Sequence, residues 1–369
     1  MDGAVATLFL SGDVMLGRGV DQILEHPGAA ALREDHLQDA RAYVELAEQA
    51  NGPIPRPVEP WWPWGDALAV LDEAAPDVRV LNLETSITRS DDFAPGKAVH
   101  YRMNPDNLAS LTVAEPDVCT LANNHVLDFG HRGLEETLDT LAVAGQESAG
   151  AGRDVYEAHR PAAVPLQGHR RVLVFSVGMA SSGIPDRWAA TTDRPGVAVL
   201  TEPSHTAVED LVDRVQQVKR PGDLVVASLH WGSNWGYEVS RSQTRVAHGL
   251  IDGGVDLVHG HSSHHPRPIE VYRGRLILYG CGDLINDYEG ISGYDRYRDD
   301  LRLLYLVRVD ASGLLVEARM LPMQARRMRL EHASGDDGHW LGNVLDRVSR
   351  PFGTRVRRES DGWLTLRPV

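Results

Sequence analysis

The 369-residue sequence predicts an α/β layered fold, and three observations support this prediction. Short apolar runs rich in β-branched residues end abruptly in polar groups, and segments with helical periodicity lie between them. Hydrophobic residues make up 42% of the chain and charged residues 24%, which is typical of a packed globular core. Strands that alternate with helices favour sheets covered by helices.

Six apolar runs are predicted to be buried strands because of their length, their β-branched content and their flanking turn residues. They are "ATLFLSGD" (6–13), "VRVLNLE" (78–84), "DVCTLANNH" (117–125), "DLVVASLHWG" (223–232), "VDLVHGH" (255–261) and "RLILYGCGD" (275–283). Helices are predicted between them, notably at 131–145, 204–220 and 241–254.

A long insertion separates the first two strands, with an amphipathic helix at roughly 29–50 and then the proline-rich "GPIPRPVEPWWPWGD". The runs 300–310 and 313–323 predict an antiparallel hairpin, and one further helix is expected near 338–349. We therefore expect one catalytic domain over 1–325, with an insertion at about 28–65, and a C-terminal extension over 326–369.

The charge and the cysteine content restrict the partners and the compartment. Lys and Arg number 37 against 52 Asp and Glu, and the resulting charge of −15 disfavours nucleic acid and anionic membranes as partners. Two cysteines cannot form a disulfide framework, and no segment reaches the roughly 18 apolar residues of a membrane span. The N-terminal "MDGAVATLFLSGD" predicts a first strand rather than a signal peptide, so we expect a cytoplasmic protein.

Polar groups follow nearly every predicted strand, and in α/β sheets ligands gather beyond the carboxyl ends of strands. These groups are Asp13, Asn82, Glu84, Asn123, Asn124, His125, His230, His259, His261, His264 and Asp283. Any one of them is more simply explained as structural. Because burying such groups unpaired is costly, their coincidence at one topological position favours a metal-centred active site.

The ordered series "GDVMLGR", "NLE", "NNH", "HWG" and "GHSSHHPRPIE…YGCGDLINDY" resembles the bacterial capsule-synthesis CapA (PGA-cap) family. That family is a branch of the calcineurin-like metallophosphoesterases, and the resemblance runs from about residue 6 to about residue 310. It implies a calcineurin-like four-layer α/β/β/α sandwich with mixed sheets and a metal at the strand ends.

Departures from the metallophosphoesterase pattern imply one metal ion in place of two. Met15 occupies the place of the histidine that usually follows Asp13, and the final Gly-His-x-His becomes "GHSSH", which displaces its second histidine by one position. The ligands that the resemblance implies are Asp13, Glu84, Asn124, His230 and His261. Oxygen ligands favour Ca, Mg or Mn and histidines would suit Zn, while no organic cofactor is expected.

Losing one ion weakens the case for phosphoester hydrolysis, whereas spare bases around one Lewis acid suit metal-assisted epimerisation. The candidate acid–base residues are His125, His264, Asp13 and Asp283. Among cytosolic members of the branch, the chain resembles the epimerases of ribosomal lasso-peptide pathways. The resemblance implies a peptide epimerase, an isomerase that inverts the α-carbon of the C-terminal residue of a precursor peptide, its expected partner.

Four residues are candidates for holding that peptide. Trp231 and Trp235 follow His230 and offer aromatic surface, and Arg18 and Arg267 are candidate partners of a terminal carboxylate. Two alternatives stay open for the function: a phosphatase or phosphodiesterase, and a non-catalytic binding protein in polyglutamate or capsule export. The sequence sets neither the metal nor the oligomeric state.

Overall fold

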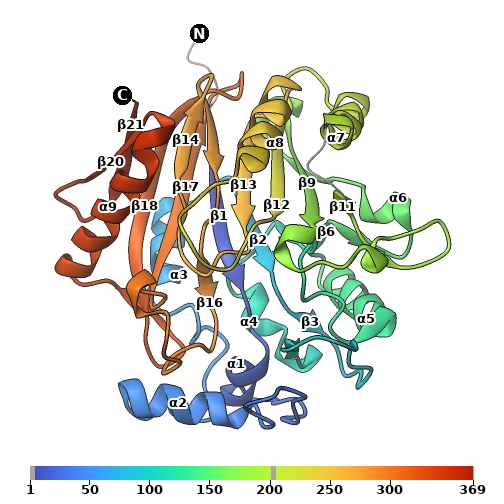
Figure 1. Ribbon diagram of the computed structural model, residues 1–369, viewed down its shortest axis with the longest axis vertical. Coiled ribbons are helices and arrows are strands. Elements are labelled where there is room, and N and C mark those ends of the chain that lie inside the picture. The colour runs from blue at the N-terminus through green and yellow to red at the C-terminus, as the bar shows by residue number, and fades with distance from the viewer. Residues whose placement is uncertain (1–4, 201–204, 369) are drawn as a thin grey trace.

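The computed structural model describes residues 5–200 and 205–368, whose elements form four layers (Figure 1). The larger sheet runs in the order β20 (Thr354–Arg358), β21 (Leu364–Pro368), β18 (Leu315–Ala325), β17 (Leu301–Val309), β1 (Ala6–Val14), β2 (Val78–Leu83), β5 (Val118–Thr120) and β6 (Glu147–Ala149). Two short strands lie off this order: β16 (Asp283–Ile285) pairs with β1, and β19 (Leu330–His332) pairs with β18.

The smaller sheet runs in the order β11 (Val199–Leu200), β9 (Arg171–Met179), β12 (Leu224–His230), β13 (Leu257–His261), β15 (Arg275–Leu278) and β14 (Ile269–Tyr272), with β8 (Ala162–Pro165) on β9. Two short pairs complete the described strands: β3 (Ser86–Ile87) with β4 (Arg102–Met103), and β7 (Ala151–Gly152) with β10 (Gly196–Val197). Both large sheets mix parallel and antiparallel neighbours.

Helices cover the outer faces of both sheets. The helices of the described residues are α1 (Arg18–Ile23), α2 (Arg41–Asn51), α3 (Ala67–Ala74), α4 (Ala109–Thr112), α5 (Gly130–Val143), α6 (Val155–Ala158), α7 (His205–Val218), α8 (Arg241–Asp252) and α9 (Gly335–Ser349). α1 to α5 pack on the larger sheet, and α7 and α8 pack on the smaller one. The predicted α/β/β/α sandwich is therefore confirmed.

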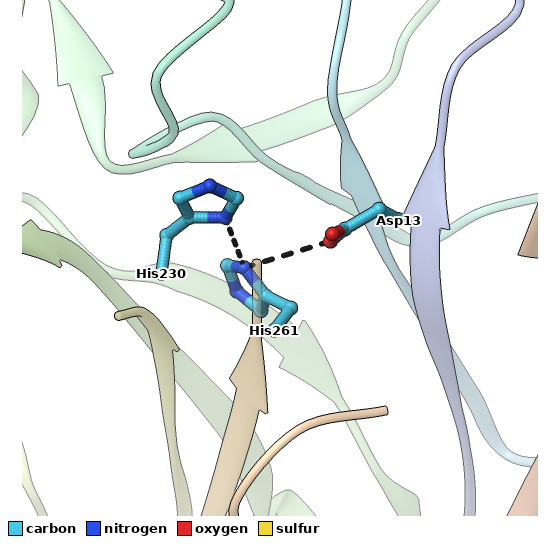
Figure 2. A group of neighbouring side chains, drawn as sticks. All are labelled: Asp13, His230 and His261. Carbon is cyan, nitrogen blue, oxygen red and sulfur yellow. Dashed lines mark hydrogen bonds and ion pairs between the residues drawn. The ribbon is translucent and has the colours of Figure 1, made fainter. Parts of the chain in front are cut away.

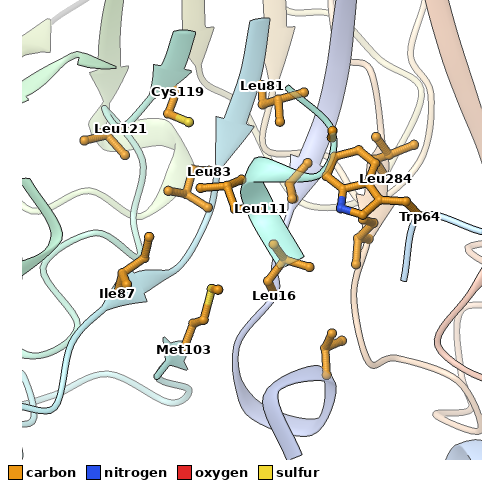
Figure 3. Close-up of a cluster of buried hydrophobic side chains, with 14 of the residues drawn as sticks. Leu16, Trp64, Leu81, Leu83, Ile87, Met103, Leu111, Cys119, Leu121 and Leu284 are labelled. Atoms are coloured by element: carbon orange, nitrogen blue, oxygen red, sulfur yellow. The ribbon is translucent and has the colours of Figure 1, made fainter. Parts of the chain in front are cut away.

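The period-two pattern of the strands separates three hydrophobic cores. On β1, Phe9 faces the helices of the larger sheet, whereas Leu8 and Leu10 face the space between the sheets. Figure 3 shows part of the first core, in which Trp64 and Leu284 pack from distant parts of the chain. Because both faces of β1 are buried, its position and that of the polar end that follows are fixed.

The predicted strand at 275–283 is in fact two strands in different sheets. β15 ends at Leu278, and the chain then crosses to the larger sheet, where β16 begins at Asp283. A Cβ on Gly12 would lie 1.9 Å from the Gly282 carbonyl oxygen, and Gly282 itself has a φ of +80°. Glycine at both positions therefore permits a crossing that places Asp283 directly beside Asp13.

Other predictions hold in part. The predicted hairpin appears as β17 and β18, and the helix predicted near 338–349 appears as α9. β19, which precedes α9, joins the larger sheet by pairing with β18. The helix expected at 29–50 is confined to Arg41–Asn51, because the preceding residues close a loop through the Ala31–Asp39 bridge. β9, "RVLVFSVGM", was not among the predicted strands.

Two predicted boundaries, the start of one helix and the end of the catalytic domain, stay predictions. Ser204, the first residue of the helix predicted at 204–220, lies outside the described residues. The domain boundary at 325/326 stays a prediction, although β19, β20 and β21 extend the larger sheet beyond it. Within the described residues, no helix is both long and apolar enough to cross a membrane.

Candidate metal centre

The carboxyl ends of four strands, two from each sheet, and the start of a fifth strand, β16, meet at one place in the structure. In the larger sheet Asp13 of β1 lies beside Asp283 of β16, and Glu84 follows β2. In the smaller sheet β12 and β13 end in paired histidines, His230 and His261 (Figure 2). The two sheets thus contribute carboxylates and imidazoles, respectively, to a single buried cluster.

The ligand atoms of this cluster form two groups that share Asp13. One group is Asp13, His230 and His261, and the other is Asp13, Glu84 and Asp283, with the ligand atoms in each group within 4.8 Å of one another. The two groups are also linked directly, because the His230 Nε2 atom lies 3.6 Å from the Glu84 Oε1 atom. All five side chains are buried.

The carboxylates repel one another in the absence of a cation. Burial, with the adjacent Asp283 charge, raises the pKa of Asp13 to about 7. Burial and the Asp13 charge raise the pKa of Glu84 well above its ordinary value. Asn82 Nδ2 donates to Asp13 at 2.6 Å, and the Ser262 amide donates to the other Asp13 oxygen at 3.1 Å. These two donors fix the carboxylate without neutralising it.

The two histidines are held as neutral imidazoles, because burial lowers the pKa of each well below its ordinary value. Their Nδ1 atoms are 2.7 Å apart, so one ring donates to the other. His230 Nε2 lies 2.8 Å from Asn124 Oδ1, and His261 Nε2 lies 2.8 Å from Ser228 Oγ. Neutral imidazoles beside hard oxygen donors fit a divalent cation.

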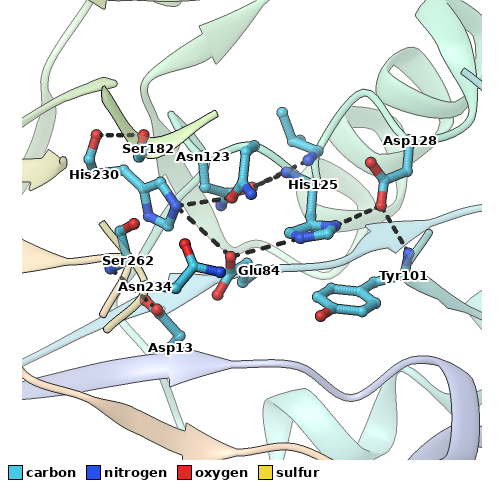
Figure 4. Close-up of polar contacts among 12 residues, drawn as sticks. Asp13, Glu84, Tyr101, Asn123, His125, Asp128, Ser182, His230, Asn234 and Ser262 are labelled. Atoms are coloured by element: carbon cyan, nitrogen blue, oxygen red, sulfur yellow. Dashed lines mark hydrogen bonds and ion pairs between the residues drawn. The ribbon is translucent and has the colours of Figure 1, made fainter. Parts of the chain in front are cut away.

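His125 forms an acid–base pair on the Glu84 side of the cluster (Figure 4). Its Nδ1 atom lies 2.6 Å from Asp128 Oδ2, and its Nε2 atom lies 3.9 Å from Glu84 Oε1. Tyr101 stacks on the imidazole with ring centroids 3.7 Å apart and also donates its amide to Asp128. Burial lowers the pKa of His125 to about 4, against the opposing effect of Asp128.

His264 forms a second pair on the opposite side, with its Nδ1 atom 3.1 Å from each Asp283 oxygen. Burial alone lowers the His264 pKa, but the Asp283 charge outweighs it and raises the pKa above its ordinary value. Asn234 contacts the outer nitrogen, Nε2, at 3.0 Å. The His264 side chain is 11% exposed, so it is partly open to solvent.

The structure brings Asp13, Glu84, His125, His264 and Asp283 together, but not all four candidates for substrate binding. Arg18 is buried and pairs with Asp287 and Glu34, one layer behind Tyr101. Trp231 is buried against Tyr279, and Arg267 donates to the carbonyls of Ser233 and Glu238. Only Trp235 lies at the edge of the cluster, with its ring 5.1 Å from the ring of His264.

Lys97 is the functional candidate that the sequence did not indicate. Its Nζ atom contacts Asp128 and the Asn124 carbonyl, and it lies 3.3 Å from His125 Nδ1. It lies in a loop without periodicity or motif, and no sequence signal connects it to the strand ends. Its contacts with His125 and Asp128 are visible only in the tertiary structure.

Comparison with known proteins places these residues in a family context. The bacterial capsule synthesis protein PGA_cap family matches residues 7–288. A probable polyglutamine synthesis accessory protein of Mycobacterium tuberculosis is 55% identical over 367 residues, which cover 99% of this chain and 97% of that protein. The PGA biosynthesis protein CapA of Bacillus subtilis is 27% identical and covers 82% of this chain and 68% of its own length.

A capsule biosynthesis protein CapA of Bacillus anthracis is 23% identical, over 84% of this chain and 66% of that protein. These relatives correct the expected activity. They are named for polyglutamine synthesis and for PGA or capsule biosynthesis, so the prediction of an isomerase acting on a lasso precursor peptide is wrong. Acid–base pairs beside a metal site are common to many chemistries, and they did not justify so specific an activity.

The resemblance to the CapA family is confirmed. The matched residues 7–288 include every residue of the cluster, from Asp13 to Asp283. The most similar of these relatives aligns with nearly the whole chain, at more than half identity. The chain belongs to the bacterial capsule synthesis protein PGA_cap family.

Proposed function

We propose that this protein is a metal-dependent accessory protein in the synthesis of a polymer of glutamate or glutamine units. The observation that carries the proposal is the convergence of buried carboxylates and neutral imidazoles from both sheets. The 55% identity to a relative named for polyglutamine synthesis supports the choice of polymer. This proposal takes up the binding protein that the sequence left as an alternative.

We propose that one divalent ion is held by Asp13, Glu84, Asn124, His230 and His261. The donor set fits it, since three of these side chains offer oxygen and two offer neutral nitrogen. Such an ion supplies a concentrated positive charge that attracts the carboxylate or carbonyl oxygen of a polymer unit.

The chain's own residues orient that unit. Burial lowers the pKa of His264, but the Asp283 charge outweighs it and favours the protonated imidazole, which offers an N–H donor and a positive charge to an anionic group at the cluster. His125 is neutral, and Asp128 orients it through Nδ1 so that Nε2 faces the centre. One side of the site therefore offers a donor, and the other offers a base that can accept a proton.

Calorimetric titration of the chelator-treated protein with Mg, Mn, Ca and Zn tests the ion. We expect one ion per chain and an affinity that falls about tenfold or more in Glu84→Gln, because a ligand charge is lost. Glu317→Gln is the matched control, since Glu317 is a half-exposed residue of β18 that pairs with Arg308. A ratio of two ions, or an unchanged affinity in Glu84→Gln, would contradict the proposed single site.

The polymer is tested in the host strain. Disruption of the gene is expected to lower the amount of cell-associated glutamate or glutamine polymer, and the wild-type gene is expected to restore it. Glu84→Gln should fail to restore it while the control Glu317→Gln succeeds, with both proteins present at equal levels on immunoblots. An unchanged amount of polymer in the disrupted strain would contradict the proposal.

A further inference from the structure

A cavity of about 930 Å³ opens beside the metal centre, on the far side of the loop that follows β12. Its wall includes Trp235 and Tyr237 of that loop, Gln243 at the start of α8, and Arg296 and Arg347. Trp235 separates the cavity from the centre, since its ring also contacts His264. A bound polymer that passes Trp235 would therefore reach both the cavity and the metal centre.

The cavity is basic in an acidic protein. Its wall carries Arg267, Arg296 and Arg347 against one acidic residue, Glu238, whereas the whole chain has a net charge of −15. Arg296 and Arg347 are exposed, and neither forms an ion pair with another described residue. Arg296 donates one N–H to the Tyr297 hydroxyl, and the positive charge of each guanidinium group remains without a carboxylate partner among the described residues, so both can pair with an anion.

Arg267 has a different role in the same wall. Burial lowers its pKa to about 10, so it still carries its charge at neutral pH. Its terminal nitrogens donate to the carbonyls of Ser233, Trp235 and Glu238, which holds the loop in place. Its Nε atom is buried without a hydrogen-bond partner among the described residues.

Gln243 supplies a second unsatisfied donor. Its Oε1 atom accepts the Ser240 amide at 3.0 Å in a capping box, so the orientation of the amide group is fixed. Its Nε2 atom then faces Gly232 in the cavity wall, where an added Cβ would lie 2.7 Å away. Nε2 is buried and has no partner among the described residues. A buried donor without a partner is costly, and a ligand oxygen would relieve that cost.

Aromatic rings complete the wall and suit an extended chain. Trp235 stacks on Tyr294 with centroids 3.9 Å apart, and it packs on Tyr297 at 5.3 Å. The neighbouring Asn234 contacts His264. Apolar surface between cationic groups accommodates the methylene groups of a polymer while its charged groups meet the arginines.

We infer that this cavity binds the free carboxylates of an extended glutamate polymer, next to the unit at the metal centre. The inference rests on the proposed function and narrows it, because it selects glutamate over glutamine. An α-linked and a γ-linked glutamate chain both carry one carboxylate per unit, whereas a glutamine chain carries uncharged amides. Unpaired arginines and unsatisfied N–H donors match carboxylates and gain much less from amides.

Calorimetry on the metal-loaded protein tests the inference with three probes of equal length: α-linked glutamate, γ-linked glutamate and α-linked glutamine oligomers. We expect at least one glutamate oligomer to bind about tenfold or more tightly than the glutamine oligomer, since the charge-assisted bonds are lost with the amide. The two glutamate arms report which linkage the cavity accepts.

Two variants locate the binding. Arg296→Gln with Arg347→Gln should weaken glutamate binding about tenfold or more, because two cations are removed. Gln243→Glu retains the capping box but replaces the free donor by an acceptor, and it should weaken binding similarly. Arg308→Gln is the matched control, since it removes one positive charge on β17, outside the cavity wall.

The outcomes separate this inference from the proposed function. Glutamate binding that is unchanged in both cavity variants would overturn the cavity and leave the proposed function standing. Equal binding of glutamine and glutamate oligomers would overturn the carboxylate selectivity. If no oligomer binds the wild-type protein, both fail. Thermal melting and metal titration of each variant should match the wild type, which excludes misfolding as the cause.

Discussion

Glu84 is the proposed ligand at which metal binding and the stability of the metal-free chain are expected to oppose each other. It is buried beside Asp13 and Asp283, and burial with these charges raises its pKa well above the ordinary value. An acid whose pKa is raised on folding destabilises the folded state once the pH exceeds its unfolded pKa. At neutral pH, Glu84 therefore costs the metal-free protein stability that a bound cation would restore.

Replacing Glu84 with Gln should consequently stabilise the metal-free protein and weaken metal binding. In chelator at pH 7, we expect the free energy of unfolding to rise by about 1 to 3 kcal/mol, as for other buried charges replaced by neutral groups. The difference should shrink toward pH 4, where the wild-type carboxyl is protonated in both states. Urea denaturation followed by circular dichroism measures it, and a less stable variant at pH 7 would refute the argument.

Lys97 and Asp128 shift the pKa of His125 in opposite directions, in addition to the larger effect of burial. The positive charge of Lys97 lowers the pKa of the imidazole, whereas Asp128 raises it. Lys97→Met should therefore move the His125 pKa upward from about 4, and Asp128→Asn should move it further down. Titration of the His125 ring signals by NMR in the metal-free protein measures both shifts. Shifts of the same sign in the two variants would show that the charges do not act on this ring as described.

The sequence located the cluster better than it assigned roles to the residues. Asp13, Glu84, His230 and His261 are recognisable because each lies at the end of a buried strand or directly after it, and strand ends share one edge of a sheet. Arg18 was expected near a substrate, but its burial depends on Asp287, which is 269 residues away. Partners so distant in sequence leave no local signal.

At the scale of elements, the C-terminal hairpin depends on one carboxylate. Asp346 of α9 accepts the Val356 amide at 3.0 Å and pairs with Arg355 and Arg350, which joins the helix to β20. Hydrogen bonds from Arg355, with Arg350 nearby, hold the pKa of Asp346 at about 2. A lowered acid pKa stabilises the folded state above its unfolded pKa, and the contribution is lost as the pH falls toward the folded value.

Asp346→Asn should therefore destabilise the protein at pH 7 by about 1 to 2 kcal/mol, a reduced figure because solvent reaches the arginines. The gap between wild type and variant should close as the pH falls from about 4 to about 2, the two pKa limits for this carboxyl. Thermal denaturation across this range, with Asp361→Asn as a surface control, measures it. A gap that stays constant with pH would mean that the charge is not what joins helix and hairpin.

The elements themselves were predictable where their periodicity was strong, and less so where tertiary contacts decide. The helical patterns of α5 and α8 and the hairpin of β17 and β18 were all predicted. The crossing between β15 and β16 was not, because no polar side chain interrupts "LILYGCG" (276–282), and the chain leaves one sheet for the other within it, where the Gly282 carbonyl accepts the Asp13 amide. An uninterrupted run cannot show which of two sheets each half joins.

At the scale of the whole molecule, the centre is a junction between the two sheets. Asp13 and Glu84 come from the larger sheet, and His230 and His261 come from the smaller one. A cation that binds all four contacts both halves of the sandwich at once. Because such a site is lost when either sheet unfolds, metal binding should stabilise the fold as a unit.

A saturating divalent ion should thus raise the melting temperature of the wild-type protein, by an amount that follows mass action. At a free ion concentration 100 times the dissociation constant, the gain is about 2.7 kcal/mol. Asp13→Asn removes a ligand from the larger sheet and His261→Gln removes one from the smaller, and each alone should abolish most of the gain. Glu317→Gln should retain it. If either ligand variant keeps the full increase, the ion is bound by one sheet only, and the centre is not the junction that the geometry indicates.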